Sequence, residues 1–270
     1  MVIKVLAIVF LVVLMLLAWG FFIEKETIKV EKFSLEIENL PSSFKDSKII
    51  HLSDLHSKNF GKMEERILVS LKTLNPDYIF ITGDIVDWTT KDLESCKEFW
   101  QKLSEGYPGK IFGVLGNHEH RNPRLKTIKS LLDESGIEIL VNESVKLEKG
   151  DQFIYLIGVD DPHLKHDDSE KAMQVINPGI PKILIAHSPE IFRDIKEKNI
   201  DLALVGHTHG GQVNIPLITD FFLPLKYDKK YKEGLFREDS TIMYVNRGIG
   251  TTAFPFRLNS FPEITLITLK

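Results

Sequence analysis

The sequence predicts a layered α/β domain with a mixed β-sheet, preceded by one helix that is apolar and long enough to cross a membrane. A long apolar run occupies the N-terminal end, and short apolar runs then alternate with amphipathic stretches, the pattern of β-α-β units. Strand-like runs dominate toward the C-terminal end, which indicates a mixed sheet. Hydrophobic residues make up 43% and charged residues 27% of the 270, so the composition is that of an ordinary globular protein rather than a disordered or fibrous one.

Charge and cysteine content exclude or disfavour several classes of protein. The formal net charge of −4 lacks the basic footprint of a dedicated nucleic-acid binder. A single cysteine, Cys96, rules out an internal disulfide framework and any multi-cysteine zinc site, and its place on an amphipathic stretch suggests inert packing.

The first 23 residues are predicted to form a membrane anchor. Residues 5–23 carry no charged or hydrogen-bonding side chain except Trp19. As a helix they would span about 28 Å, close to the ~30 Å hydrocarbon core of a bilayer. The alternative is a cleaved signal peptide, but the run is long for one, no Ala-x-Ala cleavage site follows and no twin-arginine signal is present. We therefore expect a single-pass protein of the cell membrane.

The basic residues that flank this run give a weak indication of orientation. The first flank carries Lys4 and the α-amino group, whereas the other carries Lys25, Lys29 and Lys32. Counting these residues alone favours the following domain on the cytoplasmic face.

The rest of the chain divides into a connecting segment, residues 24–47, with one or two strands over 27–37, and one domain, residues 48–270. Strands are predicted over 48–52, 78–82, 111–115, 153–159, 183–186, 202–205, 242–245 and 264–269. Helical spacing of apolar residues predicts helices over 64–74, 93–103, 123–135 and 189–198.

Five of the predicted strands run directly into polar residues that can bind metals. Carboxyl ends of neighbouring strands meet at one edge of a sheet, where α/β proteins assemble their sites. Each motif alone has an ordinary structural explanation as a turn or a helix cap, but the ordered set of five does not arise by chance. The residues are Asp54 and His56, Asp84, Asn117 with His118, His187, and His207 with His209.

The chemistry of this set is metal ligation without thiolates, which suits borderline divalent metals. Seven ligands are too many for one ion and suit two ions sharing a bridging carboxylate. Two divalent ions carry +4 and Asp54 with Asp84 carry −2, so a bridging hydroxide leaves a site of about +1 that attracts an anion. Two ions of this kind form the clamp used for in-line displacement at phosphorus.

These motifs resemble the signature of the calcineurin-like metallophosphoesterase family. They are Asp54-x-His56, Gly83-Asp84-x-x-Asp87, Gly116-Asn117-His118-Glu119, His187 and Gly206-His207-x-His209. The resemblance implies a four-layered α/β/β/α sandwich. It also implies one metal on Asp54, His56, Asp84 and His209, a second on Asp84, Asn117, His187 and His207, and His118 as the group that protonates the leaving oxygen. Mn²⁺ is the metal that the family suggests; ligand types alone leave Fe, Zn and Co open.

Further motifs look like the membrane-anchored phosphodiesterase branch of that family. They are Gly206–Gln212, Lys230-Tyr231-x-x-Gly234-Leu235, Asn246–Thr251, Pro255-x-Arg257 and Pro262-Glu263-Ile264. Some members of this branch are UDP-2,3-diacylglucosamine pyrophosphatases of lipid A synthesis. The Asn117-His118-Glu119 sequence departs from the Gly-Asn-Arg-Asp form of another lipid A pyrophosphatase type, so the substrate contacts of that type do not carry over.

The resemblance therefore implies a membrane-anchored phosphodiesterase or pyrophosphatase that uses metal-bound hydroxide on a phosphorylated small-molecule or lipid-linked substrate. The alternatives are a phosphomonoesterase or protein phosphatase on the same scaffold and, less favoured because no ligand is missing, a non-catalytic binding module. The acidic balance and the anchor disfavour a nucleic-acid substrate.

Several other residues could serve the site. His120, Arg121, Arg247 and Arg257 are candidates for binding a substrate phosphate, with loop or surface roles as the alternative. Asp87 either orients a neighbouring group or caps the next segment. Residues 218–225 are apolar and precede a lysine cluster, which suits either a membrane-interface contact or, our preferred expectation, a loop packed on the domain.

Overall fold

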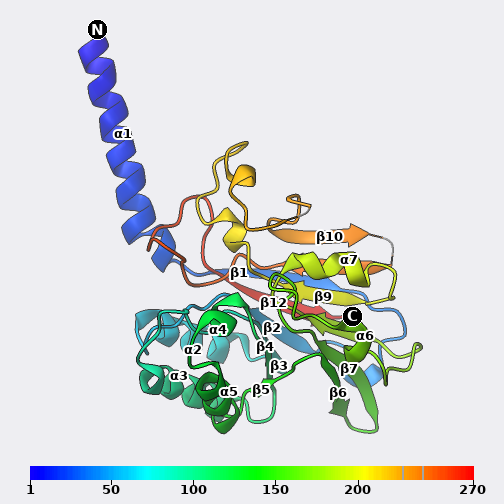
Figure 1. The fold of residues 1–270 in the computed structure, drawn as a ribbon. Coiled ribbons are helices and arrows are strands. Elements are labelled where there is room, and N and C mark those ends of the chain that lie inside the picture. Colours follow the sequence, from blue (N-terminus) through cyan, green and yellow to red (C-terminus); the bar gives the residue numbers. More distant parts are fainter. Residues whose placement is uncertain (227, 239) are drawn as a thin grey trace.

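The computed structural model describes residues 1–226, 228–238 and 240–270, and in it two six-stranded sheets lie face to face between outer layers of helices (Figure 1). This arrangement confirms the predicted α/β/β/α sandwich. Both sheets are mixed, as the strand-rich C-terminal part indicated.

The first sheet has the strand order β1-β12-β2-β3-β4-β5. Its strands are β1 (Lys29–Leu35), β2 (Lys48–Leu52), β3 (Tyr78–Thr82), β4 (Ile111–Val114), β5 (Glu138–Ile139) and β12 (Glu263–Leu269). Only the β12–β2 pairing is antiparallel, so β2, β3 and β4 point their carboxyl ends to one edge. β1 lies within the expected connecting segment and pairs with β12, the last strand of the chain.

The second sheet has the order β10-β11-β9-β8-β7-β6. Its strands are β6 (Glu143–Lys149), β7 (Gln152–Gly158), β8 (Lys182–Ile185), β9 (Leu202–Val205), β10 (Gly234–Glu238) and β11 (Thr241–Val245). The central pairings are parallel and the two outer ones, β10–β11 and β6–β7, are antiparallel.

The helices divide between the two outer faces. Those over the first sheet are α2 (Lys62–Leu74), α3 (Leu93–Gly106), α4 (Asn117–Arg121) and α5 (Leu125–Glu134). Those over the second sheet are α6 (Ser169–Ala172) and α7 (Phe192–Ile195). The helix predicted over 189–198 is shorter than expected, because a 3-10 turn, Pro189–Ile191, takes up its first part.

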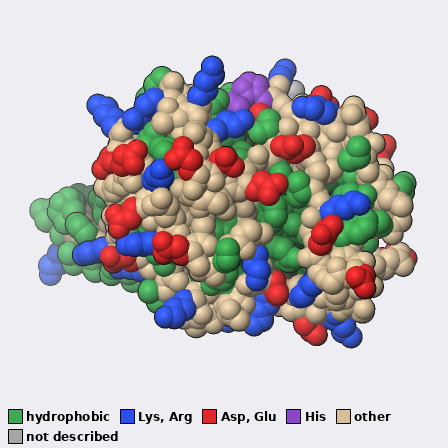
Figure 2. Space-filling view, turned by 90° about the horizontal axis from the view of Figure 1, so that it is seen from below, with side chains coloured by type: hydrophobic (Ala, Val, Ile, Leu, Met, Phe, Trp, Pro, Cys, Tyr) green, Lys and Arg blue, Asp and Glu red, His purple; other side chains and the backbone are tan. Residues whose placement is uncertain are grey.

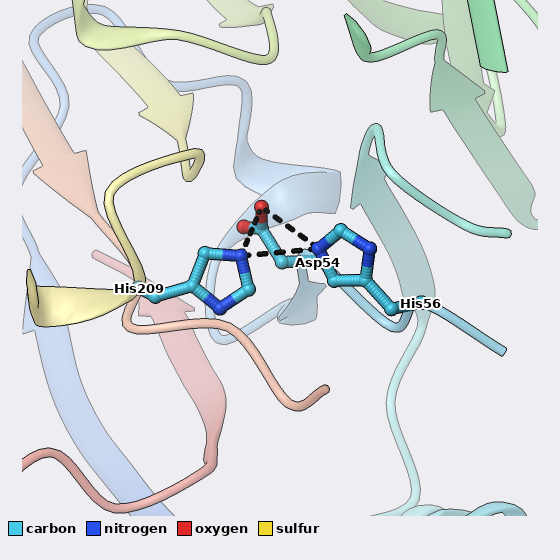
Figure 3. A group of neighbouring side chains, drawn as sticks. All are labelled: Asp54, His56 and His209. Carbon is cyan, nitrogen blue, oxygen red and sulfur yellow. Dashed lines mark hydrogen bonds and ion pairs between the residues drawn. The ribbon is translucent and has the colours of Figure 1, made fainter. Parts of the chain in front are cut away.

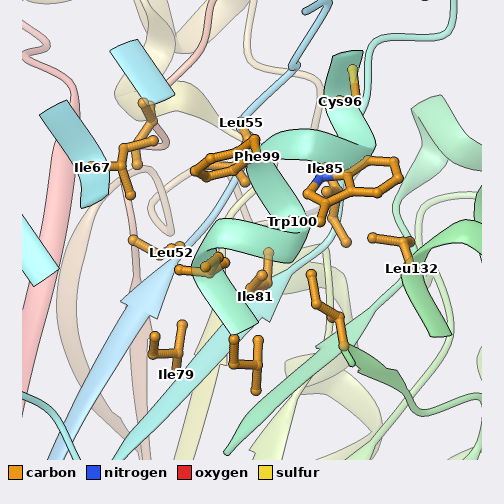
Figure 4. Packing of buried hydrophobic residues seen from close by; sticks show 14 of the residues in the cluster. Leu52, Leu55, Ile67, Ile79, Ile81, Ile85, Cys96, Phe99, Trp100 and Leu132 are labelled. Atoms are coloured by element: carbon orange, nitrogen blue, oxygen red, sulfur yellow. The ribbon is translucent and has the colours of Figure 1, made fainter. Parts of the chain in front are cut away.

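Three apolar clusters hold the layers together. Between the sheets, Ile49 and Phe80 of the first meet Leu156 and Ile183 of the second, and all four side chains are fully buried. Behind the first sheet, α3 packs Trp100 and its neighbours onto β2 and β3 (Figure 4). A third cluster fixes α6 and α7 on the second sheet. Burying an apolar side chain of this size contributes roughly 1.5–3 kcal/mol, so these clusters are a major source of stability.

The N-terminal helix α1 (Val2–Phe22) projects away from the sandwich (Figure 1). Among the described residues it is the one helix long and apolar enough to cross a membrane, with a mean hydropathy of 3.0. Its exit end is tied to the domain: the Phe21 and Phe256 rings lie 4.9 Å apart, and buried Glu24 accepts hydrogen bonds from Ser260 N (2.6 Å) and Trp19 Nε1 (2.9 Å).

The side of the molecule that lies at the bottom of Figure 1 carries charges of both signs. Seen from that side, Lys and Arg side chains alternate with Asp and Glu, and α1 protrudes beyond the domain (Figure 2). This face therefore shows no basic stripe of the kind that binds nucleic acid.

Candidate metal centre

The loops after five strands bring all seven predicted metal ligands to one edge of the sandwich. Asp54 and His56 follow β2, Asp84 follows β3, and Asn117 follows β4 at the start of α4. From the second sheet, His187 follows β8, and His207 with His209 follow β9. The seven side chains are buried, so the sheets act as a scaffold that fixes the spacing of the loops.

One group of ligand atoms forms around Asp54, His56 and His209 (Figure 3). The His209 Nε2 atom lies 3.3 Å from Asp54 Oδ1 and 3.1 Å from His56 Nε2. The distance from His56 Nε2 to Asp54 Oδ1 is 4.0 Å. A carboxylate oxygen and two imidazole nitrogens therefore converge on one point.

A second group forms around Asp84, His187 and His207. The His187 Nε2 atom lies 3.3 Å from Asp84 Oδ2, 3.0 Å from His207 Nδ1 and 3.1 Å from Asn117 Oδ1. Four potential ligand atoms again converge, with the amide oxygen of Asn117 as a neutral member.

The carboxylate of Asp84 links the two groups. Its Oδ2 atom is 3.3 Å from His187 Nε2 in the second group and 3.6 Å from His56 Nε2 in the first. Its other oxygen, Oδ1, accepts the backbone N–H of His118 at 2.8 Å. One oxygen is thus held by the backbone while the other faces both groups.

Neighbouring groups orient the other ligands in the same way. Asp54 Oδ2 accepts hydrogen bonds from Ser53 Oγ (2.6 Å) and His207 N (2.9 Å), which leaves Oδ1 for a ligand. His187 Nδ1 lies 2.8 Å from the carbonyl oxygen of Thr82, so this nitrogen donates and the ring is held with Nε2 toward the ligand group. A metal-binding histidine is normally fixed in this way by its second nitrogen.

The donor set fits divalent cations. Asp54 Oδ1 is buried without a hydrogen-bond partner, although a buried carboxylate oxygen left unpaired is costly. Two pairs of histidine nitrogens also face each other: His207 Nδ1 lies 3.0 Å from His187 Nε2, and His56 Nε2 lies 3.1 Å from His209 Nε2. Each pair could bind one shared cation. Burial raises the pKa of both Asp54 and Asp84, but the adjacent histidines outweigh burial and hold both pKa values below the usual range. Burial lowers the pKa of His56 to about 3, so its imidazole is neutral and able to bind a metal.

His118 lies beside the two groups without being one of the predicted ligands. Its Nε2 atom is 3.9 Å from Asp84 Oδ2, and its Nδ1 atom is 3.5 Å from Asp87 Oδ2. Burial lowers the pKa of His118, but the hydrogen bond to Asp87 and the charges of Asp84 and Asp87 outweigh it, so the net pKa is raised. Asp87 makes contacts of both kinds that the sequence left open. Its Oδ2 atom faces His118 and lies 3.7 Å from His56 Nδ1, and its Oδ1 atom accepts the backbone N–H of Thr89 at 2.8 Å.

Glu119 organises the same loops, a role that the sequence reading missed. It is fully buried and accepts backbone N–H groups from Asp84 (3.0 Å), Val86 (2.8 Å) and Gly116 (2.8 Å). Its pairing with Gly116, three residues earlier, has the spacing of a helix N-terminal capping box, which is the signal that could have revealed it.

A cavity of about 380 Å³ opens over the metal-ligand groups. Its wall includes Asp84, Asn117, His118, His207 and His209, together with Arg121, His163 and the apolar trio Phe222, Leu223 and Pro224. Arg121 is the only one of the four predicted phosphate-binding candidates in this wall. His163 was not predicted, because it belongs to a loop after β7 that carries no motif.

The other three phosphate-binding candidates point elsewhere. Arg257 is fully buried and donates to the carbonyl oxygens of Arg247, Gly248, Gly250 and Ser260, and burial lowers its pKa to about 10. Arg247 pairs with Glu263 (2.6 Å) and Glu31 (2.6 Å). His120 pairs with Asp160 at 2.7 Å, outside the cavity wall.

Comparisons with known proteins show the family of this chain. Residues 47–211 match the model of the calcineurin-like phosphoesterase family. The chain is 31% identical to the uncharacterized metallophosphoesterase YkuE of Bacillus subtilis, over 92% of this chain and 88% of that protein. It is 29% identical to phosphodiesterase YaeI of Escherichia coli, over 84% of each chain.

Two further comparisons concern the membrane and the fold. A Danio rerio protein named "transmembrane protein with metallophosphoesterase domain" is 33% identical to this chain. The aligned region covers 90% of this chain but only 57% of the Danio rerio protein. The crystal structure of TT1561 from Thermus thermophilus shares the fold, with a TM-score of 0.53 and 14% identity over 76% of this chain and 91% of that one. The family and its named relatives make this chain a metal-dependent phosphoric ester hydrolase. The chain belongs to the calcineurin-like phosphoesterase family.

Proposed function

We propose that this protein is a membrane-anchored phosphodiesterase that uses two divalent ions, with Mn²⁺ as the expected metal. The observation that carries the proposal is the carboxylate of Asp84, whose Oδ2 atom faces the ligand groups of His56 and His187 at once. A carboxylate in that position suits a bridge between two ions.

The ligand assignment follows from the two groups. Asp54, His56, His209 and Asp84 would hold one ion, and Asp84, Asn117, His187 and His207 the other. When bound, the ions would supply Lewis-acid polarisation of a phosphoryl oxygen and a water-derived nucleophile at neutral pH. The two carboxylates leave part of the cationic charge uncompensated, which favours an anionic substrate.

His118 is the proposed general acid. Its Nε2 atom faces Asp84 and lines the cavity, so it can donate a proton to the oxygen of the departing group. Asp87, beside Nδ1, favours the protonated imidazolium that this step requires. Arg121 and His163 in the cavity wall are positioned to contact the substrate's phosphate.

The anchoring proposal rests on α1. The helix is exposed and apolar along its length, and a relative of this chain is named a transmembrane protein. Lys25, Lys29 and Lys32 at its exit favour a domain on the cytoplasmic face. A lipid-linked nucleotide such as UDP-2,3-diacylglucosamine would suit a cavity that has an apolar wall and that would gain positive charge from two bound ions.

A single comparison of substrates tests this proposal. The full chain in detergent micelles, loaded with Mn²⁺, would be given bis(p-nitrophenyl) phosphate, p-nitrophenyl phosphate and UDP-2,3-diacylglucosamine. We expect diester or pyrophosphate cleavage to exceed monoester cleavage. Asp84→Ala should lose bound metal and activity, whereas His118→Ala should keep metal and turn over slowly. Full activity with full metal content in Asp84→Ala would refute the assignment, and faster monoester cleavage would favour a phosphomonoesterase.

A further inference from the structure

Exposed apolar side chains gather in two loops of the domain. Outside α1, Leu217, Phe221 and Phe222 in the loop after β9 are 84%, 78% and 80% exposed, and Phe254 in the loop after β11 is 71% exposed. With Ile218, at 52%, these five residues are called the apolar rim below. The remaining exposed large apolar side chains of the described domain are mostly single and scattered, which is normal for a soluble surface.

The expectation that residues 218–225 pack on the domain holds for only part of that segment. Leu223 and Leu225 are buried at 5% exposure each, whereas Ile218, Phe221 and Phe222 face outward. The loop is held by hydrogen bonds: Thr219 Oγ1 donates to Val213 O at 2.6 Å and accepts from Ile215 N at 2.7 Å. The buried leucines and these bonds fix the aromatic side chains in an exposed position.

The two loops of the apolar rim are joined to each other and to the exit of α1. Gln212 Nε2 donates to the carbonyl oxygens of Thr252 and Phe254, at 3.0 and 3.1 Å, which links the loops. Phe256, two residues after Phe254, packs on Phe21 of α1. The loop after β9 rises on the same side of the sandwich as α1 (Figure 1).

Polar groups at the base of the apolar rim suit a lipid headgroup region. Lys229 Nζ donates to Phe221 O at 3.1 Å, and Lys226 Nζ donates to His163 O at 2.6 Å. Lys229 thus holds an ammonium group against the backbone of an exposed aromatic residue, a combination typical of segments that lie at a membrane interface.

We propose that the apolar rim inserts into the bilayer that α1 crosses and forms a second membrane contact of the domain. Phe222 belongs to both the apolar rim and the cavity wall, so this contact would open the cavity toward the lipid headgroups. The substrate class is then an amphiphilic phosphoester that enters with its acyl chains still in the membrane. This second statement rests on the proposed phosphodiesterase function, whereas the membrane contact does not.

Site-directed spin labelling of the full chain tests the contact without any need for activity. Cys96, the only natural cysteine, is buried, and burial raises the pKa of its thiol to about 12, so it should not take up the label. Leu217→Cys and Phe221→Cys would each carry a nitroxide in nanodiscs of phosphatidylcholine and phosphatidylglycerol. Val69→Cys, on α2 and 68% exposed, is the matched control.

We expect the labels at 217 and 221 to collide with oxygen, which concentrates in lipid, and to be protected from a water-soluble nickel chelate. The label at 69 should show the opposite preference. Equal access of the nickel chelate to all three positions would overturn the membrane contact, and would indicate a surface that is free or that binds a soluble partner.

A kinetic comparison tests the substrate class. Leu217→Ser/Phe221→Ser, which changes no cavity residue, would be compared with Val69→Ser on phosphatidyl-p-nitrophenol in nanodiscs and on soluble bis(p-nitrophenyl) phosphate. Removing a large apolar side chain from lipid costs about tenfold in partitioning, so the double variant should lose about tenfold or more in kcat/KM for the embedded diester alone. Equal loss on both substrates, or no loss on either, would overturn the proposed route. Absence of turnover by the unaltered protein would instead count against the phosphodiesterase proposal and leave the labelling result standing.

Discussion

Gly116→Ala is expected to displace the carboxylate of Asp84 with little direct effect on the backbone conformation of residue 116. Gly116 has φ −112° and ψ −177°, an extended conformation that alanine adopts freely. A Cβ atom there would lie 2.3 Å from Asp84 Oδ1 and 2.6 Å from Asp84 N. Since real Cβ contacts essentially never fall under 3.0 Å, the Asp84 carboxylate oxygen must retreat by about 0.7 Å, and the backbone of Asp84 must shift with it.

The size of the effect follows from that displacement. The moved carboxylate faces both ligand groups, and a misplacement of about 1 Å in a catalytic site can cost about 100-fold in rate. We therefore expect kcat for an aryl phosphodiester to fall about 100-fold and bound metal to decrease. Gly106→Ala is the control, because a Cβ at that end of α3 meets no atom within 4 Å.

The assay needs three readouts on both variants: kcat with saturating Mn²⁺, metal bound per chain, and circular dichroism to confirm folding. A folded Gly116→Ala protein with unaltered kcat and metal content would refute the reasoning, since Asp84 could then move without consequence. Equal losses in both variants would show that the effect is not specific to the contact with Asp84.

Three further outcomes are expected. Asp87→Asn removes a negative charge that raises the pKa of His118. In a plot of kcat against pH, the decrease on the alkaline side should therefore begin at lower pH than in the unaltered protein. A decrease that begins at the same or a higher pH would contradict the contact between Asp87 and His118. Glu24→Ala leaves the buried N–H of Ser260 without its acceptor, which should lower the free energy of unfolding by about 1–3 kcal/mol. The melting temperature should therefore fall while kcat is unchanged. An unchanged melting temperature would mean that this contact does not stabilise the fold. Cys96 should react with a thiol reagent at pH 8 only after unfolding, because its pKa is about 12, and rapid reaction of the folded chain would contradict its burial.

Sequence reasoning identified every inner strand of both sheets and one edge strand, β1. β2, β3 and β9 match their predicted bounds, and each is mostly apolar with almost every residue buried. The three missed strands, β5, β6 and β10, are all edge strands. An edge strand has a neighbouring strand on one side only, so more of its side chains reach solvent. The three missed strands therefore contain mostly exposed and half-buried residues, and they lack the continuous buried pattern of the inner strands.

The candidate site was predictable to the extent that its residues follow apolar strands directly. Asp54 and Asp84 could be found because each comes within two residues of a strand end. Glu119 offered only the capping-box spacing with Gly116 as a signal. His163 offered none, because its place in the cavity wall depends on which loops become neighbours after folding. The residue type of Arg257 suits phosphate, but its buried guanidinium donates to four backbone carbonyl groups, a set of contacts that only the folded loops reveal.

The backbone of the site adds a cost that the residue types alone do not reveal. Asp54, His56, Asp84, His207 and His209 all have positive φ, between 47° and 70°. Non-glycine residues in that region cost of order 1–3 kcal/mol each, so such strain persists only where surrounding contacts over-determine it. Those contacts run between neighbouring loops: Asp54 N donates to Gly83 O at 3.1 Å, and His56 N to Asp84 O at 2.9 Å. The loop after one strand therefore stabilises the strained loop after the next. Because the two sheets fix the distance between the strands, five of the seven ligands keep backbone conformations that an isolated segment would not adopt.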